Sequence, residues 1–397
     1  MQSDSSRVDI AFVAAHAVTP ALNSGGDVLF ANVAREIARL RPDWRVAVIA
    51  PDYACDGLAP FFRTVVPLPS RPGEAERLGG HSGAIVAAWL RRMRPCEDAL
   101  LRLAPRIVHT TGDFFCDVLP AARGLRRAAY RFTGVVHHLN PPPLRRRSEL
   151  PAASASWVMQ QISLRALRAG CDRVVLLNEH VAAALRSYGF RATQLAVLGA
   201  GIDLARFPLT PAPPARMRVL WVHRLEPTKG MFDLPRLAAL LPQASHIDVV
   251  GRGPRAARER LEAELARAGV RERFTFHGHV EDAQLAALYA NANAFVSCSY
   301  EEGWGLSLAE ALAAGVPCVA YALPSHAAVF PGLVETVPAG DVAALAHLLR
   351  GVLERSEPPQ ARLQRRAGVE PYSFAAAAER HVALFEELIA EGPRRDP

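Results

Sequence analysis

The stretch that decides the fold is AFVSCSYEEGWGLSLAEALAAGVPCVAY, residues 294–321. It opens on a short apolar run at 294–297 that is typical of a buried strand. A loop with two glycines follows, then a helix-forming segment, and then a second apolar run at 317–321. A strand, a loop, a helix and a second strand make the repeating unit of a parallel sheet. The stretch therefore predicts an α/β fold.

The same alternation of apolar runs and helix-length segments continues through both halves of the chain. In the first half, strands are predicted at residues 10–14, 45–50, 106–109, 134–137 and 173–177, with a helix at 28–40. In the second half they are predicted at residues 219–222, 247–250, 273–276, 294–297 and 317–321. This pattern places helices on both faces of parallel sheets, so we predict two doubly wound, Rossmann-like domains.

A proline-rich segment separates the two halves. Four prolines fall within residues 208–214, and such a run neither continues a helix nor fits a central strand. We predict an N-terminal domain at 1–205 and a C-terminal domain at 216–373. Residues 374–397 are predicted to form a last helix, packing back toward the N-terminal domain, and a frayed tail. Since parallel sheets bind ligands beyond the carboxyl ends of their strands, we expect the site in a cleft between the domains.

Length and composition narrow the class of protein. A chain of 397 residues is long enough for two cores, and no apolar run reaches the ~20 residues that a membrane span needs. The six cysteines are scattered without a Cys-x-x-Cys spacing, so we expect reduced thiols and neither a metal site nor a disulfide framework. The polar first residues do not resemble a signal peptide, and the expected location is the cytoplasm.

The net charge of +7 is unevenly distributed. Residues 91–147 hold 12 arginines and only 4 acidic residues, so this stretch carries the whole positive excess. Such a stretch predicts an anionic partner, either an anionic acceptor or the inner face of an anionic membrane that the protein would contact peripherally. The alternative is a solubilising surface. Nucleic acid is not expected as a partner, because no nucleic-acid-binding module is recognisable.

The basic residues include only one lysine, Lys229, and all the others are arginine. It lies in the loop His223 to Gly230, which follows the predicted strand 219–222. A lysine kept where arginine is otherwise universal suggests that a compact ammonium is needed there. Lys229 and Arg224 beside a glycine, in a loop between a strand and a helix, suit a phosphate group. Chance survival of one lysine is the alternative.

Two further loops of the second half also place glycines directly after a predicted strand. Gly251 and Gly253 follow the strand at 247–250, although a Gly-x-Gly turn often marks only a tight bend. Between 299 and 311, two glycines open a helix, and backbone N–H groups at a helix start form an anion cradle. Glu302 precedes this cradle and Glu310 lies two turns into the helix. Two other glutamate pairs share their spacing, so the strand and glycine context, and not the spacing, singles them out.

Four blocks in this order resemble glycosyltransferase family 4. They are Arg224 with Lys229-Gly230, Gly251-Arg252-Gly253, Phe276-His277-Gly278-His279-Val280 with Leu285 and Tyr289, and Ser299 to Leu306 with Glu310 and Gly315-Val316-Pro317. The resemblance covers residues 199–320 well and extends loosely to Gly25-Gly26 and His137-His138. It implies the GT-B fold, retention of the anomeric configuration, and a nucleotide diphosphate sugar, with UDP or GDP, as the donor.

The resemblance also implies a role for individual residues. Arg224 and Lys229 would hold the donor diphosphate, and Glu310 would accept from the ribose hydroxyls. His137 or His138 would face the sugar from the first domain. The transferred sugar and the distal phosphate would contact Glu302 and the segment Gly303, Trp304, Gly305, Leu306 and Ser307. Gly25, Gly26, Gly251, Gly253 and His279 would complete the donor site.

Metal independence follows from the residues themselves. The chain has no Asp-x-Asp pair, so fixed cations must neutralise the leaving diphosphate, and no metal and no cofactor besides the sugar nucleotide are expected. Two departures from the family pattern are Cys298, where proline is usual, and Ala322 to His326, where Gly-Gly and a glutamate are frequent. We therefore predict a retaining glycosyltransferase with an unidentified acceptor. The alternatives are a non-catalytic sugar-nucleotide-binding subunit, and an epimerase or phosphorylase on the same fold.

Overall fold

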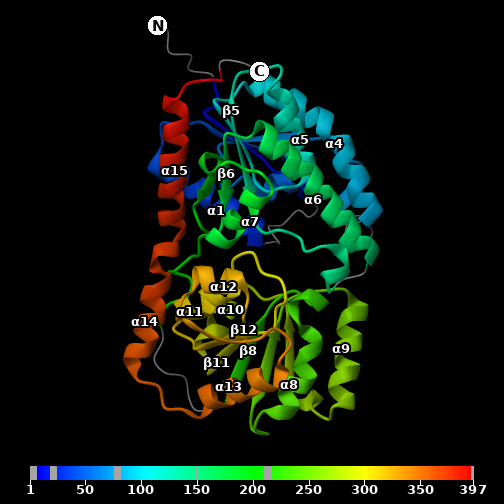
Figure 1. Ribbon diagram of the computed structural model, residues 1–397, viewed down its shortest axis with the longest axis vertical. Coiled ribbons are helices and arrows are strands. Elements are labelled where there is room, and N and C mark those ends of the chain that lie inside the picture. Colours follow the sequence, from blue (N-terminus) through cyan, green and yellow to red (C-terminus); the bar gives the residue numbers. More distant parts are fainter. Residues whose placement is uncertain (1–6, 18–24, 76–81, 148–149, 210–216, 395–397) are drawn as a thin grey trace. The chain divides into compact units, whose positions relative to one another are not determined.

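The structure is a computed structural model that describes residues 7–17, 25–75, 82–147, 150–209 and 217–394 (Figure 1). The chain divides into two compact units. Unit 1 contains residues 1–145, 149–201 and 374–397, and unit 2 contains residues 146–148 and 202–373. The predicted proline connector lies largely at 210–216, outside the described residues.

Unit 1 is built on a seven-stranded parallel sheet in the order β3-β2-β1-β4-β5-β6-β7. Its strands are β1 (Ile10–Val13), β2 (Val46–Pro51), β3 (Thr64–Leu68), β4 (Ile107–Thr110), β5 (Arg131–Val136), β6 (Arg173–Leu176) and β7 (Leu195–Val197). The order reverses between β1 and β4, which makes this the switch point of a doubly wound sheet. Strand β1 is entirely buried, as its unbroken apolar sequence predicts.

Helices cover this sheet and bury its apolar residues. They are α1 (Gly25–Leu40), α2 (Cys55–Leu58), α4 (Ser82–Leu103), α5 (Phe115–Gly124), α6 (Leu150–Gly170), α7 (Glu179–Ser187) and α15 (Phe374–Ala390), with the 3-10 turns η1 (Asp52–Ala54), η2 (Pro143–Arg145) and η3 (Ala192–Gln194). Helix α15, although last in the chain, packs on α1. Helix α5 packs between α4 and α6, and Figure 1 shows these three helices together.

Unit 2 repeats the topology with a six-stranded parallel sheet in the order β10-β9-β8-β11-β12-β13. Its strands are β8 (Arg218–Val222), β9 (His246–Val250), β10 (Phe274–Gly278), β11 (Ala294–Ser297), β12 (Cys318–Tyr321) and β13 (Val334–Val337). The helices are α8 (Leu234–Leu240), α9 (Arg255–Arg267), α10 (Asp282–Ala290), α11 (Leu306–Ala313), α12 (Pro324–Val329), α13 (Val342–Glu354) and α14 (Pro359–Val369). Four 3-10 turns are η4 (Pro227–Lys229), η5 (Met231–Asp233), η6 (Arg271–Arg273) and η7 (Glu370–Tyr372). The switch point lies between β8 and β11.

Arginines of α14 satisfy the carbonyl groups at the end of α11. The last carbonyls of a helix have no partner within it. Arg362 Nη2 donates to Ala314 O at 3.1 Å, and Arg365 Nε donates to Gly315 O at 3.0 Å. These two arginines are buried, and they place positive charge at the negative end of the α11 dipole. They hold in place the helix that the glycine loop opens.

The structure adds three strands that the sequence pattern did not predict, β3, β7 and β13. All three lie at an edge of their sheet. Their residues are mostly half-buried or exposed, and β3 contains Pro67. An edge strand faces solvent along one side, so its sequence lacks the unbroken apolar run that marks a central strand.

Candidate active site

The loops that follow β8 and β11 meet at the switch point of unit 2. Strands β8 and β11 are neighbours in the sheet, and both loops leave from their carboxyl ends. The β8 loop carries Lys229 in η4, and the β11 loop carries Glu302 and leads into α11. Tyr300 N donates to Thr228 O at 2.8 Å, which joins the two loops through their backbones. This is the position where doubly wound sheets bind ligands.

Lys229 is tied to the β11 loop through its ammonium group. Its Nζ donates to Glu301 O at 2.7 Å and to Glu302 Oε1 at 2.8 Å. Both side chains of the ion pair are 14% exposed. A compact ammonium reaches a carbonyl and a carboxylate at the same time, whereas a planar guanidinium is a wider fork. The single lysine of the chain therefore lies at the centre of the β8–β11 site.

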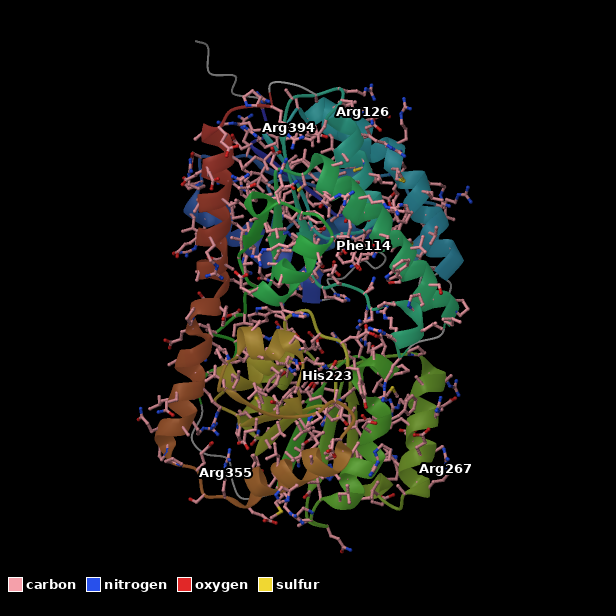
Figure 2. All side chains as sticks on the ribbon, in the orientation of Figure 1. Phe114, Arg126, His223, Arg267, Arg355 and Arg394 are labelled. Atoms are coloured by element: carbon pink, nitrogen blue, oxygen red, sulfur yellow. The ribbon has the colours of Figure 1, made fainter. Side chains whose placement is uncertain are left out.

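Glu302 is held as a carboxylate. Burial alone would raise its pKa, but the charge of Lys229, with a smaller contribution from His223, lowers the pKa of Glu302 to about 2. Burial lowers the pKa of His223 to about 3, so this imidazole is neutral although its Nδ1 lies 3.6 Å from Glu302 Oε1. Figure 2 labels His223 among the packed side chains of unit 2. Lys229 and Glu302 therefore form an ion pair between an ammonium and a carboxylate.

Gly230 allows the two loops to approach closely. Its φ of +68° lies in the left-handed region, and a Cβ at this position would lie 1.9 Å from Cys298 O. Gly251 is similar, because a Cβ there would lie 1.9 Å from His223 O at a φ of +132°. No side chain fits at either position. The Gly251 turn therefore supports the β8 loop directly, and a Cβ on Gly253 would likewise meet Leu225 O at 2.4 Å.

Helix α11 begins directly after the glycine loop, with Gly305 as its N-cap and Leu306 and Ser307 in its first turn. Glu310 is on this helix and accepts a hydrogen bond from Tyr289 Oη at 2.8 Å. Burial raises the pKa of Glu310 to about 7, against the opposing effects of Tyr289 and Arg206. Free backbone N–H groups at the start of a helix, together with a carboxylate in its second turn, can bind a phosphate and a hydroxyl-bearing group.

The other predicted residues of unit 2 lie in different surroundings. Arg224 is 65% exposed, and its Nη1 donates to Glu226 Oε1 at 2.6 Å. Trp304 is buried, with its ring packed against Phe330 and Tyr372, so only its backbone is open to a ligand. His279 is exposed after β10. The β8–β11 site therefore consists of Lys229, Glu302 and the backbone of Gly303 to Leu306.

His326 is a buried residue that the sequence analysis noted only as part of a departure from the family pattern. Its Nδ1 donates to Tyr321 O at 3.1 Å, so the neutral ring carries its lone pair on Nε2, and Nε2 has no partner among the described residues. Burial lowers the pKa of His326, although Glu302 raises it. Its Cδ2 would lie 3.6 Å from a Cβ on Gly305. No sequence signal distinguishes this histidine from an ordinary helix residue.

In unit 1, His137 and His138 follow β5, as predicted for a strand end. His137 Nε2 donates to Thr111 O at 3.0 Å, and both residues are half-buried. Burial lowers the pKa of His137. Gly25 and Gly26 form the first turn of α1. Their roles toward a donor or an acceptor stay predictions.

Unit 1 holds a charged cluster at its own switch point. His16, in the loop after β1, places Nδ1 2.7 Å from Asp117 Oδ2 and Nε2 3.3 Å from Asp27 Oδ1. Because carboxylates only accept, both ring nitrogens carry protons and the ring is an imidazolium. Burial would lower the pKa of His16, but Asp117 and Asp27 raise it to about 10. No local pattern in the sequence pairs His16 with Asp117, because 101 residues separate the two.

Two kinds of feature are absent from the part of the chain that the structure describes. No group of three or more histidine, cysteine, aspartate or glutamate side chains is placed to hold a metal ion within the described ranges. Among the helices described, none has the length and apolar character required to cross a bilayer.

Two family models match the chain. The model described as Glycosyltransferase Family 4 matches residues 23–206, and the model described as Glycosyl transferases group 1 matches residues 210–368. The first covers most of unit 1 and the second most of unit 2.

Similar curated proteins are bacterial enzymes whose names describe the synthesis of glycogen or the transfer of a sugar. The chain is 33% identical to a glycogen synthase of Mycobacterium tuberculosis over 195 residues, which are 45% of this chain and 44% of the relative. It is 31% identical to a D-inositol 3-phosphate glycosyltransferase of Mycolicibacterium gilvum over 233 residues, 54% of this chain and 48% of the relative. It is 26% identical to an MMP alpha-(1->4)-mannosyltransferase of Mycolicibacterium hassiacum over 77% of this chain and 78% of the relative. The chain thus spans about half the length of the first two relatives.

Solved structures share the fold over nearly the whole chain. Sucrose-phosphate synthase from Thermosynechococcus elongatus superposes with a TM-score of 0.81 at 23% identity, covering 97% of this chain and 100% of that one. HepE of Anabaena, in complex with UDP and glucose, superposes with a TM-score of 0.68 at 17% identity, covering 97% and 99%. The fold is therefore the GT-B type. With both family models matched in order along this fold, the chain belongs to glycosyltransferase family 4.

Proposed function

We propose that this protein transfers a sugar from a nucleotide diphosphate sugar to an acceptor, with retention of the anomeric configuration and without a metal ion. The observation that carries the proposal is the joint placement of Lys229, Glu302 and the start of α11 at the switch point between β8 and β11. Fixed charges in this place suit a reaction in which negative charge grows on a leaving phosphate.

Each residue then has a defined task. The leaving diphosphate would lie against the α11 N-terminus and Lys229, whose charge is already oriented by Glu301 O and Glu302. Arg224, exposed at the same loop, would turn from Glu226 to the diphosphate. Glu310 would accept from the ribose hydroxyls. The lone pair of His326 Nε2 would accept from a donor hydroxyl after a small movement of the glycine loop.

The chemistry needs little beyond these groups. As the bond from the anomeric carbon to the phosphate oxygen breaks, positive charge develops on the sugar and negative charge on the phosphate. Lys229 offsets the negative charge, and the phosphate oxygen can take the proton from the acceptor hydroxyl. Because the charges of Lys229 and Glu302 are fixed before the donor arrives, they need no reorganisation in the transition state.

The acceptor is proposed to be anionic, on the basis of the arginines in 91–147. Ion pairs with described carboxylates engage seven of these twelve arginines. Arg146, for example, pairs with Glu301 at 3.0 Å, and Arg147 stacks on Tyr300, so both arginines already contact unit 2 residues. Arg102, Arg123, Arg126 and Arg145 remain for an acceptor among the described residues.

A donor screen tests the proposal. Thermal unfolding is measured with UDP, GDP, ADP and TDP and with their sugars, because a ligand that binds only the folded state raises Tm by mass action. One nucleotide family is expected to raise Tm, and its sugar is then offered to candidate acceptors, with the anomeric configuration of the product read by NMR. Stabilisation without consumption of donor, whatever the acceptor, would support a binding subunit instead.

Lys229→Ala tests the contribution of this lysine to turnover. Loss of the lysine is expected to remove roughly 2–4 kcal/mol of transition-state stabilisation, about 30- to 1000-fold in turnover. Since it also leaves Glu302 unpaired, the double variant Lys229→Ala/Glu302→Gln serves as the control for stability. Lys229→Arg should retain the charge but lose part of the rate. Wild-type turnover in Lys229→Ala would rule out the assignment.

A further inference from the structure

Helix α6 presents an apolar face to solvent. Six of its exposed residues recur at intervals of four and three, which is one face of a helix, and Leu150, Ala152 and Arg168 are exposed beside this face. The six are Pro151, Ala155, Val158, Ile162, Arg165 and Ala169. A surface helix usually carries charged residues on this side. Here only Arg165 is charged, and the face is otherwise made of apolar side chains.

The opposite face of α6 already serves the core of unit 1. Ala153, Leu164 and Leu167 are buried there, and Gln160 donates to Asp113 Oδ2 at 2.6 Å. Packing on α5 therefore accounts for only one side of the helix. A helix that is apolar on both sides is normally covered on both, by protein or by lipid. None of the residues that the structure describes covers the exposed side of α6.

The turn η2, which packs against α6, extends the same surface. Leu144 of this turn is 88% exposed, and Leu150, Val158 and Ile162 are 52%, 49% and 41% exposed. These are four of the nine large apolar residues that the described structure leaves exposed. Single exposed leucines are common, but a group on two adjacent elements marks an interaction surface. We call these four residues and the α6 stripe the α6 surface.

Charge indicates what covers the α6 surface. Helix α6 contains no aspartate or glutamate, and its two charged residues are Arg165 and Arg168. Arg145 is exposed next to Leu144. Apolar side chains flanked by arginines, on a helix that lies along a surface, match the interface of a bilayer with anionic headgroups. A second copy of the chain would bring the same arginines together with no acidic residue of α6 to pair with them.

The area of the α6 surface also favours a membrane over a second protein. A stable protein dimer buries about 800 Å² on each side, which four part-exposed apolar side chains and a few small residues do not supply. An interfacial membrane contact needs only a few inserted side chains, because each gains hydrophobic free energy when it leaves water, and the arginines add attraction to anionic lipid. We therefore propose that the α6 surface docks the protein onto an anionic membrane, with Leu144, Leu150, Val158 and Ile162 entering the headgroup region.

Sedimentation with lipid vesicles tests this. The full chain is mixed with vesicles of phosphatidylcholine alone and of phosphatidylcholine with phosphatidylglycerol. The wild type should bind the anionic vesicles, and less so as salt rises, because the Debye length falls from about 30 Å at 0.01 M to about 8 Å at 0.15 M. Val158→Asp/Ile162→Asp should weaken vesicle binding at least tenfold. The matched control is Leu240→Asp/Leu363→Asp, which alters two apolar residues of unit 2 that are 45% and 48% exposed, and it should bind as the wild type does.

The outcomes separate this proposal from the transferase assignment, on which it does not rest. The Tm shift with the effective nucleotide, measured on the same samples, should be equal in the wild type and both double variants. If the aspartate pair lowers Tm, Val158→Gln/Ile162→Gln replaces it. Equal vesicle binding by the α6 variants and the wild type would overturn the proposal, as would no binding by the wild type. A wild-type dimer that the α6 variants break would reassign the surface to self-association.

Discussion

At the scale of single residues, the site depends on one ammonium group and the space around it. Lys229 donates to a carbonyl and a carboxylate of the same loop, and the neighbouring glycine brings that loop within contact distance. The lysine stood out in the sequence because every other basic residue is arginine. Its partner could not be read from the sequence, since Glu302 is 73 residues away.

Gly230→Ala should cost far more stability than Gly269→Ala. Both glycines have nearly the same φ, +68° and +69°, so both alanines carry the same left-handed strain of about 1–2 kcal/mol. Gly269 has open space for a Cβ, whereas at Gly230 the Cβ would lie 1.9 Å from Cys298 O. Urea denaturation should show about 1 kcal/mol lost for Gly269→Ala and ~3 kcal/mol or more for Gly230→Ala. Equal losses would show that the β8–β11 contact is not tight.

Nucleotide binding should weaken as the pH falls below 7. The raised pKa of Glu310, about 7, means that the carboxyl is protonated on the acid side and is then a poor acceptor for ribose hydroxyls. If only the carboxylate binds, affinity should fall about tenfold for each pH unit below the pKa. Burial lowers the pKa of His223 and His326, so neither takes up a proton at neutral pH.

Titration calorimetry of the effective nucleotide between pH 5.5 and 8.5 provides the measurement. Glu310→Gln should bind more weakly at pH 8 and show a flat profile, whereas a slope that persists in this variant would point to another group. The stability of the fold depends on pH in the opposite direction to nucleotide affinity. A carboxyl whose folded pKa is raised destabilises the fold once it ionises, so this contribution lowers stability as the pH rises from the unfolded pKa, about 4.3, through 7.

At the scale of elements, the arginine-rich helix α4 combines two kinds of arginine. Arg92 is 1% exposed, and its Nη1 donates to Ala15 O and Ala17 O at 2.8 and 2.9 Å. Its Nη2 pairs with Glu74, which is itself buried. Arg92 therefore pins α4 to the loop after β1. Arg94, two residues on, is 78% exposed and pairs with Asp98 of the same helix.

Arg92→Met should destabilise unit 1 by about 3–5 kcal/mol, because it removes the buried one of the two arginines that pair with Glu74 and leaves two buried carbonyls without their donor. Arg94→Ala should change the free energy of unfolding by no more than about 0.5 kcal/mol. Chemical denaturation followed by circular dichroism compares the two. A small effect of Arg92→Met would mean that the arginine is not needed to hold the loop.

At the scale of the whole molecule, the two units repeat one topology, and each places its charged cluster at its own switch point. In unit 1 the cluster is His16 with Asp27 and Asp117, and in unit 2 it is Lys229 with Glu302. Both clusters contain fixed cations held by carboxylates. Fixed cations of this kind are what a transferase without a metal would use for its donor phosphate.

Turnover of the intact enzyme should therefore survive an excess of EDTA. The physical reason is that Lys229 and the α11 N-terminus supply the positive charge that a divalent ion would otherwise bring. Initial rates are compared with and without chelator, and after adding back Mg²⁺ or Mn²⁺. Loss of turnover that either ion restores would contradict metal independence.

Much of the fold was determined by the sequence alone. The central strands β1, β8 and β11 are short unbroken apolar runs followed by loops and helices, and such runs are local signals that need no knowledge of distant residues. The glycine loop, Glu302 and Glu310 could likewise be assigned to the start of a helix, because the strand and glycines around them are local signals. The family resemblance rested on these local blocks, and it is confirmed.

Only the tertiary structure decided the pairings. Lys229 with Glu302, His16 with Asp117, and His326 near Gly305 join residues that lie far apart in the chain, and no local pattern records such contacts. The edge strands β3, β7 and β13 also became visible only in the sheet, because half-exposed strands lack the apolar run of central ones. The arginine-rich stretch shows the same limit. Its charge could be counted from the sequence, but burial decided that Arg92 belongs to the core and Arg94 to the surface.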